Sequence, residues 1–218
     1  MMNKNMKLFA GIIVFGSLWG FSECIIGPIM SDAGLPGGML MTGSFTMIFL
    51  VLSRMMFQQR GMQMGMGLIA GSLRMMNPFA GCHLCSAIAI MAEGMLFELI
   101  WNYTTTHNLN SLNDLTTKVS LGVFTAFTVY TGGYIVTQIM TPIVSVGSFQ
   151  IANLLSFIPY ILSKALIVGL IGGISIPIIL SSNKLHLSLK ETMYYPATLG
   201  ISLFCWTAII GNWLMYMG

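Results

Sequence analysis

Long apolar segments separated by short polar stretches fill almost the whole chain of 218 residues. A helix needs about 20 mainly apolar residues to cross a bilayer. The third segment is short and rich in glycine, so it is either a tilted helix or a partly re-entrant one. The pattern predicts an all-α, polytopic membrane bundle of six to seven transmembrane helices, with residues 1–218 as a single transmembrane domain. The candidate spans are residues 8–30, 37–57, 61–77, 80–101, 119–141, 151–180 and 193–217.

The composition supports a membrane location. Hydrophobic residues make up 56% of the chain and charged residues only 7%, whereas a soluble domain has roughly 25% charged residues. Lipid must therefore cover most of the surface. The net charge of +3 is small, and no basic run suits nucleic acid. The basic N-terminus leads into an apolar run that is too long for a cleavable signal, so we expect an uncleaved first span.

The basic residues outside the spans predict the orientation. Cytoplasmic loops of membrane proteins carry an excess of lysine and arginine. With a cytoplasmic N-terminus and seven spans in the cell membrane, every such residue falls inside and the C-terminus lies outside. If the third segment does not cross, this partition fails. The basic residues concerned are Lys4, Lys7, Arg54, Arg60, Lys118, Lys184 and Lys190.

Four charged residues lie within the predicted spans, namely Glu23, Arg74, Glu93 and Lys164. Charge at that depth is costly and usually faces a bundle interior on a substrate or ion path. At 1.5 Å per residue, Glu23 lies about 24 Å from the inner face, in the outer half of the membrane. We expect Glu23 and Arg74 to contact a ligand, with Glu93 and Lys164 forming the floor of the site.

Two alternatives remain open for these charges. We expect Glu93 to pair with Lys164 in the bundle centre, and the alternative is that this pair only specifies helix packing. Arg74 could also simply extend to the membrane interface. Two further polar residues at the outer ends of their spans, Asn153 and Asn212, complete the predicted substrate-binding set.

One motif has the residue types of a metal site. Cys82 and Cys85 form a C-x-x-C motif that contains His83, and thiolate and imidazole ligands suit zinc or copper(I). A single motif of this kind is also compatible with ordinary packing at the mouth of a helix. No cofactor is expected otherwise. The chain has no recognisable nucleophile–base set or nucleotide-binding motif, so we do not expect an enzyme.

Three stretches carry a family resemblance. They are the small-residue run Gly16–Glu23, the glycine-rich run Gly65–Leu73 and the triplet Ala92-Glu93-Gly94. On these stretches the chain resembles the substrate-binding (S) components of prokaryotic energy-coupling factor transporters. The resemblance implies about six helices and an outward-facing pocket for a vitamin, a cofactor precursor or a metal. It also implies that Gly16 and Gly20 contact a membrane coupling subunit, which works with ATPases.

The leading hypothesis is a membrane substrate-capture subunit or small transporter for a small polar or zwitterionic solute. Its expected partners are the lipid bilayer, the solute, a coupling subunit and ATPases. The main alternative is an accessory or anchor subunit of a larger membrane complex, such as a redox complex, with methionine-rich faces against its partners. A membrane enzyme using Glu93 or the Cys82–Cys85 pair ranks last.

Overall fold

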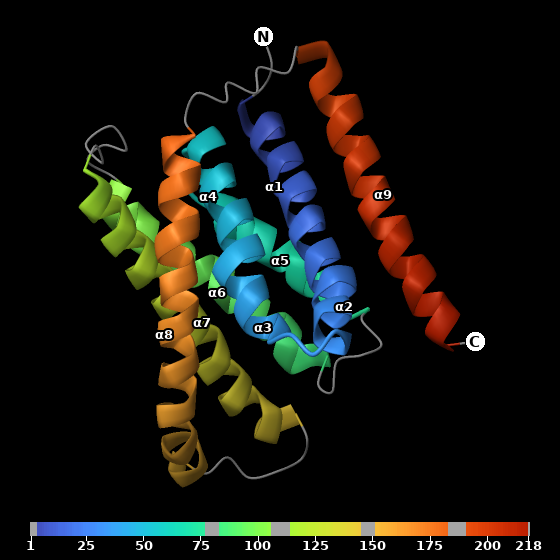
Figure 1. Cartoon of the computed structure of the whole chain (residues 1–218). Coiled ribbons are helices and arrows are strands. Elements are labelled where there is room, and N and C mark those ends of the chain that lie inside the picture. Colours follow the sequence, from blue (N-terminus) through green and yellow to red (C-terminus); the bar gives the residue numbers. More distant parts are fainter. Residues whose placement is uncertain (1–3, 77–82, 106–113, 145–150, 183–190, 218) are drawn as a thin grey trace.

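The computed structural model describes residues 4–76, 83–105, 114–144, 151–182 and 191–217, and all the regular structure there is helical (Figure 1). Two of the helical rods are each built from three consecutive elements. The first joins α1 (Lys4–Phe21), the π-helix η1 (Ser22–Ile26) and α2 (Gly27–Asp32). The second joins α3 (Gly37–Leu40), the π-helix η2 (Met41–Thr46) and α4 (Met47–Met56). The other rods are α5 (Met62–Arg74), α6 (His83–Thr105), α7 (Leu115–Val144), α8 (Ile151–Ser181) and α9 (Glu191–Met217).

Six of these rods are long and apolar enough to cross a membrane, within the residues that the structure describes. The exception is α5, which has 13 residues and is therefore about 20 Å long. The prediction of an all-α membrane bundle with six to seven spans is confirmed. The short, glycine-rich third segment is the one element whose length alone does not indicate a crossing.

The contacts of α5 give its direction. Gly16 of α1 lies against Ile69, and Gly20 lies against Leu73, so α5 runs parallel to α1. Gly71 of α5 lies against Ala87 of α6, and Gly94 lies against Gln63, so α6 runs back antiparallel. Short as it is, α5 therefore carries the chain along the bundle in the same sense as α1.

The remaining rods continue this alternation. Trp101 of α6 donates a hydrogen bond to Thr125 of α7 over 3.2 Å, and Gly122 of α7 packs on Gly172 of α8. Tyr194 of α9 donates to the main-chain oxygen of Lys7 over 3.2 Å, and Trp206 donates to Ser17 over 2.8 Å. Helix α9 is thus parallel to α1 and lies at the outside of the bundle (Figure 1).

The bundle has two distinct ends, which we name after Lys7 and Glu23 of the first rod. Arg54 and Lys118 lie near helix ends on the Lys7 side, and Arg60 lies there in the connection between α4 and α5. This distribution agrees with the predicted partition of basic residues for the described part of the chain. The assignment of the Lys7 end to the cytoplasm stays a prediction.

The core is centred on α5, which lies between α1 and α6. Trp19, Met47, Met66 and Phe97 are fully buried there. Glycines let the backbones approach closely, since a Cβ added to Gly71 would lie 2.7 Å from the main-chain oxygen of Ala87. Small residues at such positions are typical of packed membrane helices. This close packing holds the C-terminal end of α5 beside η1 and α6, where Arg74 contributes to the site.

Candidate functional site

A polar cavity of about 230 Å³ lies on the Glu23 side of the bundle. Three of the four charged residues predicted from the sequence, Glu23, Arg74 and Glu93, line it together. They come from η1, α5 and α6, three separate helical elements. The described lining is completed by Gly38, Thr42, Ser86, Ala89, Ile90, Tyr130, Gly133, Tyr134 and Thr137.

Both π-helical segments contribute a lining residue, since Glu23 belongs to η1 and Thr42 to η2. Pro28 has no N–H to donate to the carbonyl of Cys24 four residues earlier, which disfavours regular α-helix there. In η2, the Ser44 hydroxyl donates to the carbonyl of Leu40, a type of hydrogen bond that often bends helices. Such single wide turns are frequent at functional sites, and both of them lie at this cavity.

Arg74 is held in a fixed position by hydrogen bonds. Its Nε donates to the Ser86 hydroxyl over 3.0 Å, and its Nη1 donates to the main-chain oxygen of Glu23. Its charge also attracts the Glu23 carboxylate. The guanidinium thus connects α5 to η1 and α6. Arg74 is partly buried and lines the cavity, which favours a role in the site over the alternative in which it extends to the membrane interface.

Glu93 is the most deeply buried charged residue of the cavity, with 8% of its surface exposed. Its Oε1 accepts a hydrogen bond from the Thr42 hydroxyl over 3.3 Å. Its Oε2 is buried and has no hydrogen-bond partner in the described residues. A buried acceptor without a partner costs about 1–3 kcal/mol, and more when it is charged. Glu93 therefore brings to the cavity a carboxylate whose hydrogen-bonding capacity is only partly used.

Glu23 lies beside two further buried donors. The indole N–H of Trp19 and the hydroxyl of Thr46 face its carboxyl group. Neither donor meets the geometry of a normal hydrogen bond to any described residue. The Glu23 side chain itself is only half-buried because it faces the cavity. Hydrogen-bonding groups without a partner among the described residues thus lie at both acidic residues of the site.

The chain matches no protein-family model, no curated protein and no solved structure. The bundle agrees with the S-component resemblance in having six apolar helices of membrane-spanning length among its described residues. Any finer statement about function therefore rests on the residues of this chain and on the geometry of its cavity.

Lys164 does not join the other three charges. Its Nζ lies 4.2 Å from the centre of the Tyr160 ring, and its charge also interacts with Tyr134, which lines the cavity. The predicted Glu93–Lys164 pair is wrong, since Glu93 Oε2 has no partner and Oε1 is bonded to Thr42. Helical side chains point toward the N-terminus of their own helix. Lys164 follows that direction and reaches Tyr160, one turn earlier.

The other predicted site residues lie elsewhere. Asn212 belongs to α9, which contributes no residue to the described lining of the cavity. Asn153 has its backbone in α8, but its side chain lies outside the described residues.

The predicted metal motif is only partly covered by the structure. Cys82 and the side chain of His83 lie outside the described residues. Cys85 is buried and disulfide-bonded, so its sulfur is not the thiolate that a metal would need. Among the described side chains, no group of three potential metal ligands occurs.

The expected role of Gly16 and Gly20 requires correction. Both glycines are buried against α5 of the same chain. A Cβ added to Gly16 would lie 2.7 Å from Ile69, and one added to Gly20 would lie 2.8 Å from Leu73. A coupling subunit cannot reach this face while α5 covers it. The sequence correctly indicated a close helix contact here, but the contacting helix is internal.

Several neutral lining residues were missed by sequence reasoning. Thr42, Ser86, Tyr130, Tyr134 and Thr137 provide hydroxyl groups around the cavity. A signal was present in α7, because residues at i, i+4 and i+7 share one helix face, and Tyr130, Tyr134 and Thr137 have that spacing. Ser86 lies seven residues before Glu93 and so shares its face of α6.

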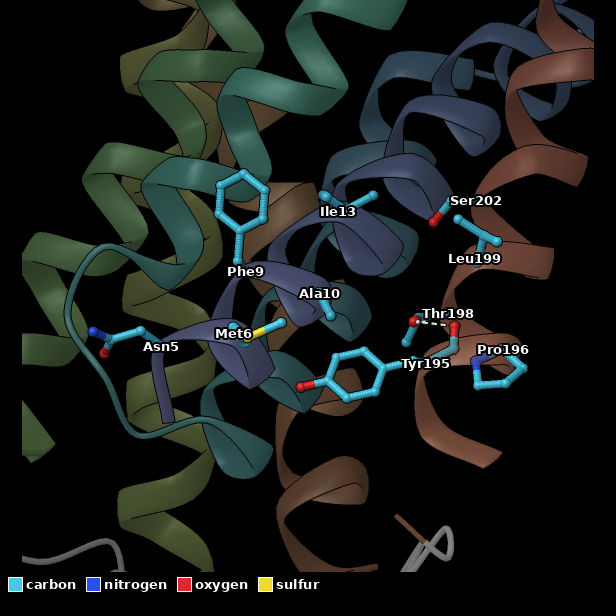
Figure 2. Close-up of a pocket in the computed structure, with 10 residues that line it drawn as sticks. All are labelled: Asn5, Met6, Phe9, Ala10, Ile13, Tyr195, Pro196, Thr198, Leu199 and Ser202. Atoms are coloured by element: carbon cyan, nitrogen blue, oxygen red, sulfur yellow. Dashed lines mark hydrogen bonds between the residues drawn. The ribbon is translucent and has the colours of Figure 1, made fainter. Parts of the chain in front are cut away.

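A larger groove of about 830 Å³ lies between α1 and α9 on the Lys7 side (Figure 2). Apolar side chains such as Phe9, Ile13 and Leu199 dominate it, and no charged residue belongs to its described lining. This chemistry suits lipid rather than a polar solute. The smaller cavity is therefore the candidate functional site, although it has about a quarter of the volume.

Proposed function

We propose that this protein captures a small polar solute inside the membrane, as a substrate-binding subunit or a small transporter. The observation that carries the proposal is the convergence of Glu23, Arg74 and Glu93 on one cavity. Charged residues inside a membrane bundle are costly and are usually kept for a functional reason. Here they come from three elements that are far apart in the sequence.

A purely structural role accounts less well for this arrangement. A charge network that only fixes helix packing should use up its own hydrogen-bonding groups, because unpaired buried charge is destabilising. Arg74 fits a structural role, since its donors bind Ser86 and Glu23. Glu93 does not, because Oε2 is left without a partner in the described residues. This difference within one cavity supports a site that a ligand completes.

The resemblance to S components supports the capture role and its direction. If the Lys7 end is cytoplasmic, the cavity lies in the outer half of the membrane and receives its solute from outside. The chain has no nucleotide-binding motif, so active uptake would require a coupling subunit and ATPases. Since α5 covers Gly16 and Gly20, that subunit would have to bind another surface. The proposal assigns no catalytic residue and no cofactor.

Native mass spectrometry of gently purified protein tests the proposal. We expect a bound small solute that is lost, or much reduced, in Glu23→Gln protein with an unchanged helical circular-dichroism spectrum. A matched control is Asp32→Asn, because Asp32 is an exposed acid outside the cavity. Protein that carries no solute but co-purifies with large membrane subunits would contradict the proposal and favour the accessory-subunit alternative.

A further inference from the structure

We infer that the captured solute is a small organic cation whose ammonium group binds Glu93; this inference rests on the proposed capture function. It narrows the earlier expectation of a polar or zwitterionic solute. The first reason is the charge of the cavity. Two carboxylates, Glu23 and Glu93, and one guanidinium, Arg74, line it. When the three groups are ionised, one negative charge is left uncompensated.

The second reason is that the positive charge in the cavity is already engaged. Arg74 donates through Nε to Ser86 and through Nη1 to the carbonyl of Glu23. Its charge also attracts the Glu23 carboxylate. A solute carboxylate would have to compete with these groups for the guanidinium. Glu93 has no cationic partner among the described residues, because Lys164 lies over Tyr160 instead.

The third reason is the unused acceptor of Glu93. Glu93 is more than nine-tenths buried, lines the cavity, and has an Oε2 without a partner. A carboxylate oxygen accepts hydrogen bonds, and an ammonium group donates three. A bound ammonium would satisfy this oxygen and also offset the cost of the buried negative charge.

Aromatic rings beside Glu93 extend the same preference. Tyr130 and Tyr134 both line the cavity, and their ring centres lie 5.0 Å apart. Cations are attracted to aromatic faces, most strongly in a desolvated site. The rings and the carboxylate thus favour the same kind of ligand group. An anionic head group would meet neither preference.

The volume of the cavity limits the size of the cation. About 230 Å³ is available, which corresponds to roughly eight water molecules at about 30 Å³ each. An amine with a few carbon atoms fits that space. Ile90 and Ala89 in the lining provide a small apolar surface for its carbon chain.

Calorimetric titration of the purified protein in nanodiscs of zwitterionic lipid tests the inference. Four probes of similar length separate the charge classes: butylammonium, 1-butanol, butyrate and 4-aminobutyrate. We expect butylammonium to bind most tightly. We expect Glu93→Gln to weaken its binding at least about 30-fold, because truncating one side of a buried charge pair costs 2 kcal/mol or more.

Two further variants make the test specific. Tyr134→Leu keeps an apolar side chain but removes the aromatic face, and we expect it to weaken butylammonium more than 1-butanol. Glu98→Gln is the matched control, because Glu98 accepts hydrogen bonds from Gly61 and Met64 at the start of α5, away from the cavity. We expect Glu98→Gln to bind butylammonium like the unchanged protein. Thermal unfolding of each empty variant verifies that it is folded.

The outcomes distinguish this inference from the proposed function. Tighter binding of butyrate, 4-aminobutyrate or 1-butanol than of butylammonium would overturn the cation assignment and leave the capture site intact. Equal butylammonium affinity in Glu93→Gln protein would also overturn it. If none of the four probes binds and native mass spectrometry finds a non-cationic solute, the cation assignment is refuted but the capture function is not. If none of the four probes binds and no solute is found, both the cation assignment and the capture function are refuted.

Discussion

The Glu93 carboxylate packs directly against the backbone of Gly133 in the neighbouring helix. A Cβ added to Gly133 would lie 2.9 Å from Glu93 Oε1 and 3.0 Å from Glu93 Cγ. The missing side chain at Gly133 is therefore what makes room for the acid between α6 and α7. This contact ties the geometry of the site to the packing of two long helices.

Gly133→Ala should displace the Glu93 side chain and destabilise the bundle. Overpacking a closely packed site typically costs about 1–3 kcal/mol. Thermal unfolding in detergent measures this loss. Gly200→Ala is the matched control, because a Cβ at Gly200 of α9 meets nothing within 4 Å, and we expect its unfolding temperature to be unchanged or slightly raised. Equal unfolding temperatures for both variants would contradict the packing described for Glu93.

Arg74→Lys should weaken the junction of α5, η1 and α6 although it keeps the charge. A lysine ammonium lacks the planar fork that lets Arg74 bind Ser86 and the carbonyl of Glu23 together. We expect a loss of about 1–3 kcal/mol, the cost of a buried group left unsatisfied, measured as a lower unfolding temperature. The exposed Arg60 provides the control: Arg60→Lys should unfold like the unchanged protein, and a similar loss in both would argue against a specific junction.

Glu98→Ala should destabilise the start of α5. Glu98 of α6 accepts hydrogen bonds from the backbone N–H groups of Gly61 and Met64, which have no partners within their own helix. Loss of a comparable helix cap costs about 0.5–2 kcal/mol. Hydrogen exchange of the first turn of α5 should therefore quicken. Exchange that stays as slow as in the unchanged protein, or quickens equally in Asp32→Ala, would count against this cap.

Cysteine labelling of whole cells should report the direction of α5. Ser31, Gln58 and Met75 are exposed residues at successive turns of the chain. If α5 crosses the membrane and the N-terminus is cytoplasmic, Ser31→Cys and Met75→Cys should react with an impermeant maleimide. Gln58→Cys should react only after permeabilisation. If Met75→Cys reacts under the same conditions as Gln58→Cys, α5 does not cross. If Gln58→Cys reacts in intact cells while Ser31→Cys and Met75→Cys react only after permeabilisation, the orientation is the reverse of the predicted one.

The depth of charged residues was the most informative sequence signal for the site. Glu23, Arg74 and Glu93 line one cavity, and the cost of burying charge in a membrane made them stand out from an apolar pattern. Thr42, Tyr130 and Tyr134 did not stand out, since hydroxyl-bearing residues are far less costly there. Lys164 was misplaced because a long side chain can reach several neighbours from one backbone position.

The sequence by itself determined that this is an all-α membrane bundle, because the length and spacing of its apolar runs are matched to the hydrocarbon layer. It also indicated that the third segment is short and rich in glycine, and hence either tilted or partly re-entrant. Only the tertiary structure decided that α5 covers Gly16 and Gly20, and that Glu93 meets Thr42 and Gly133 rather than Lys164. A pattern along the chain indicates which helix face is tightly packed, whereas the partner of that face depends on the shapes of all the helices together.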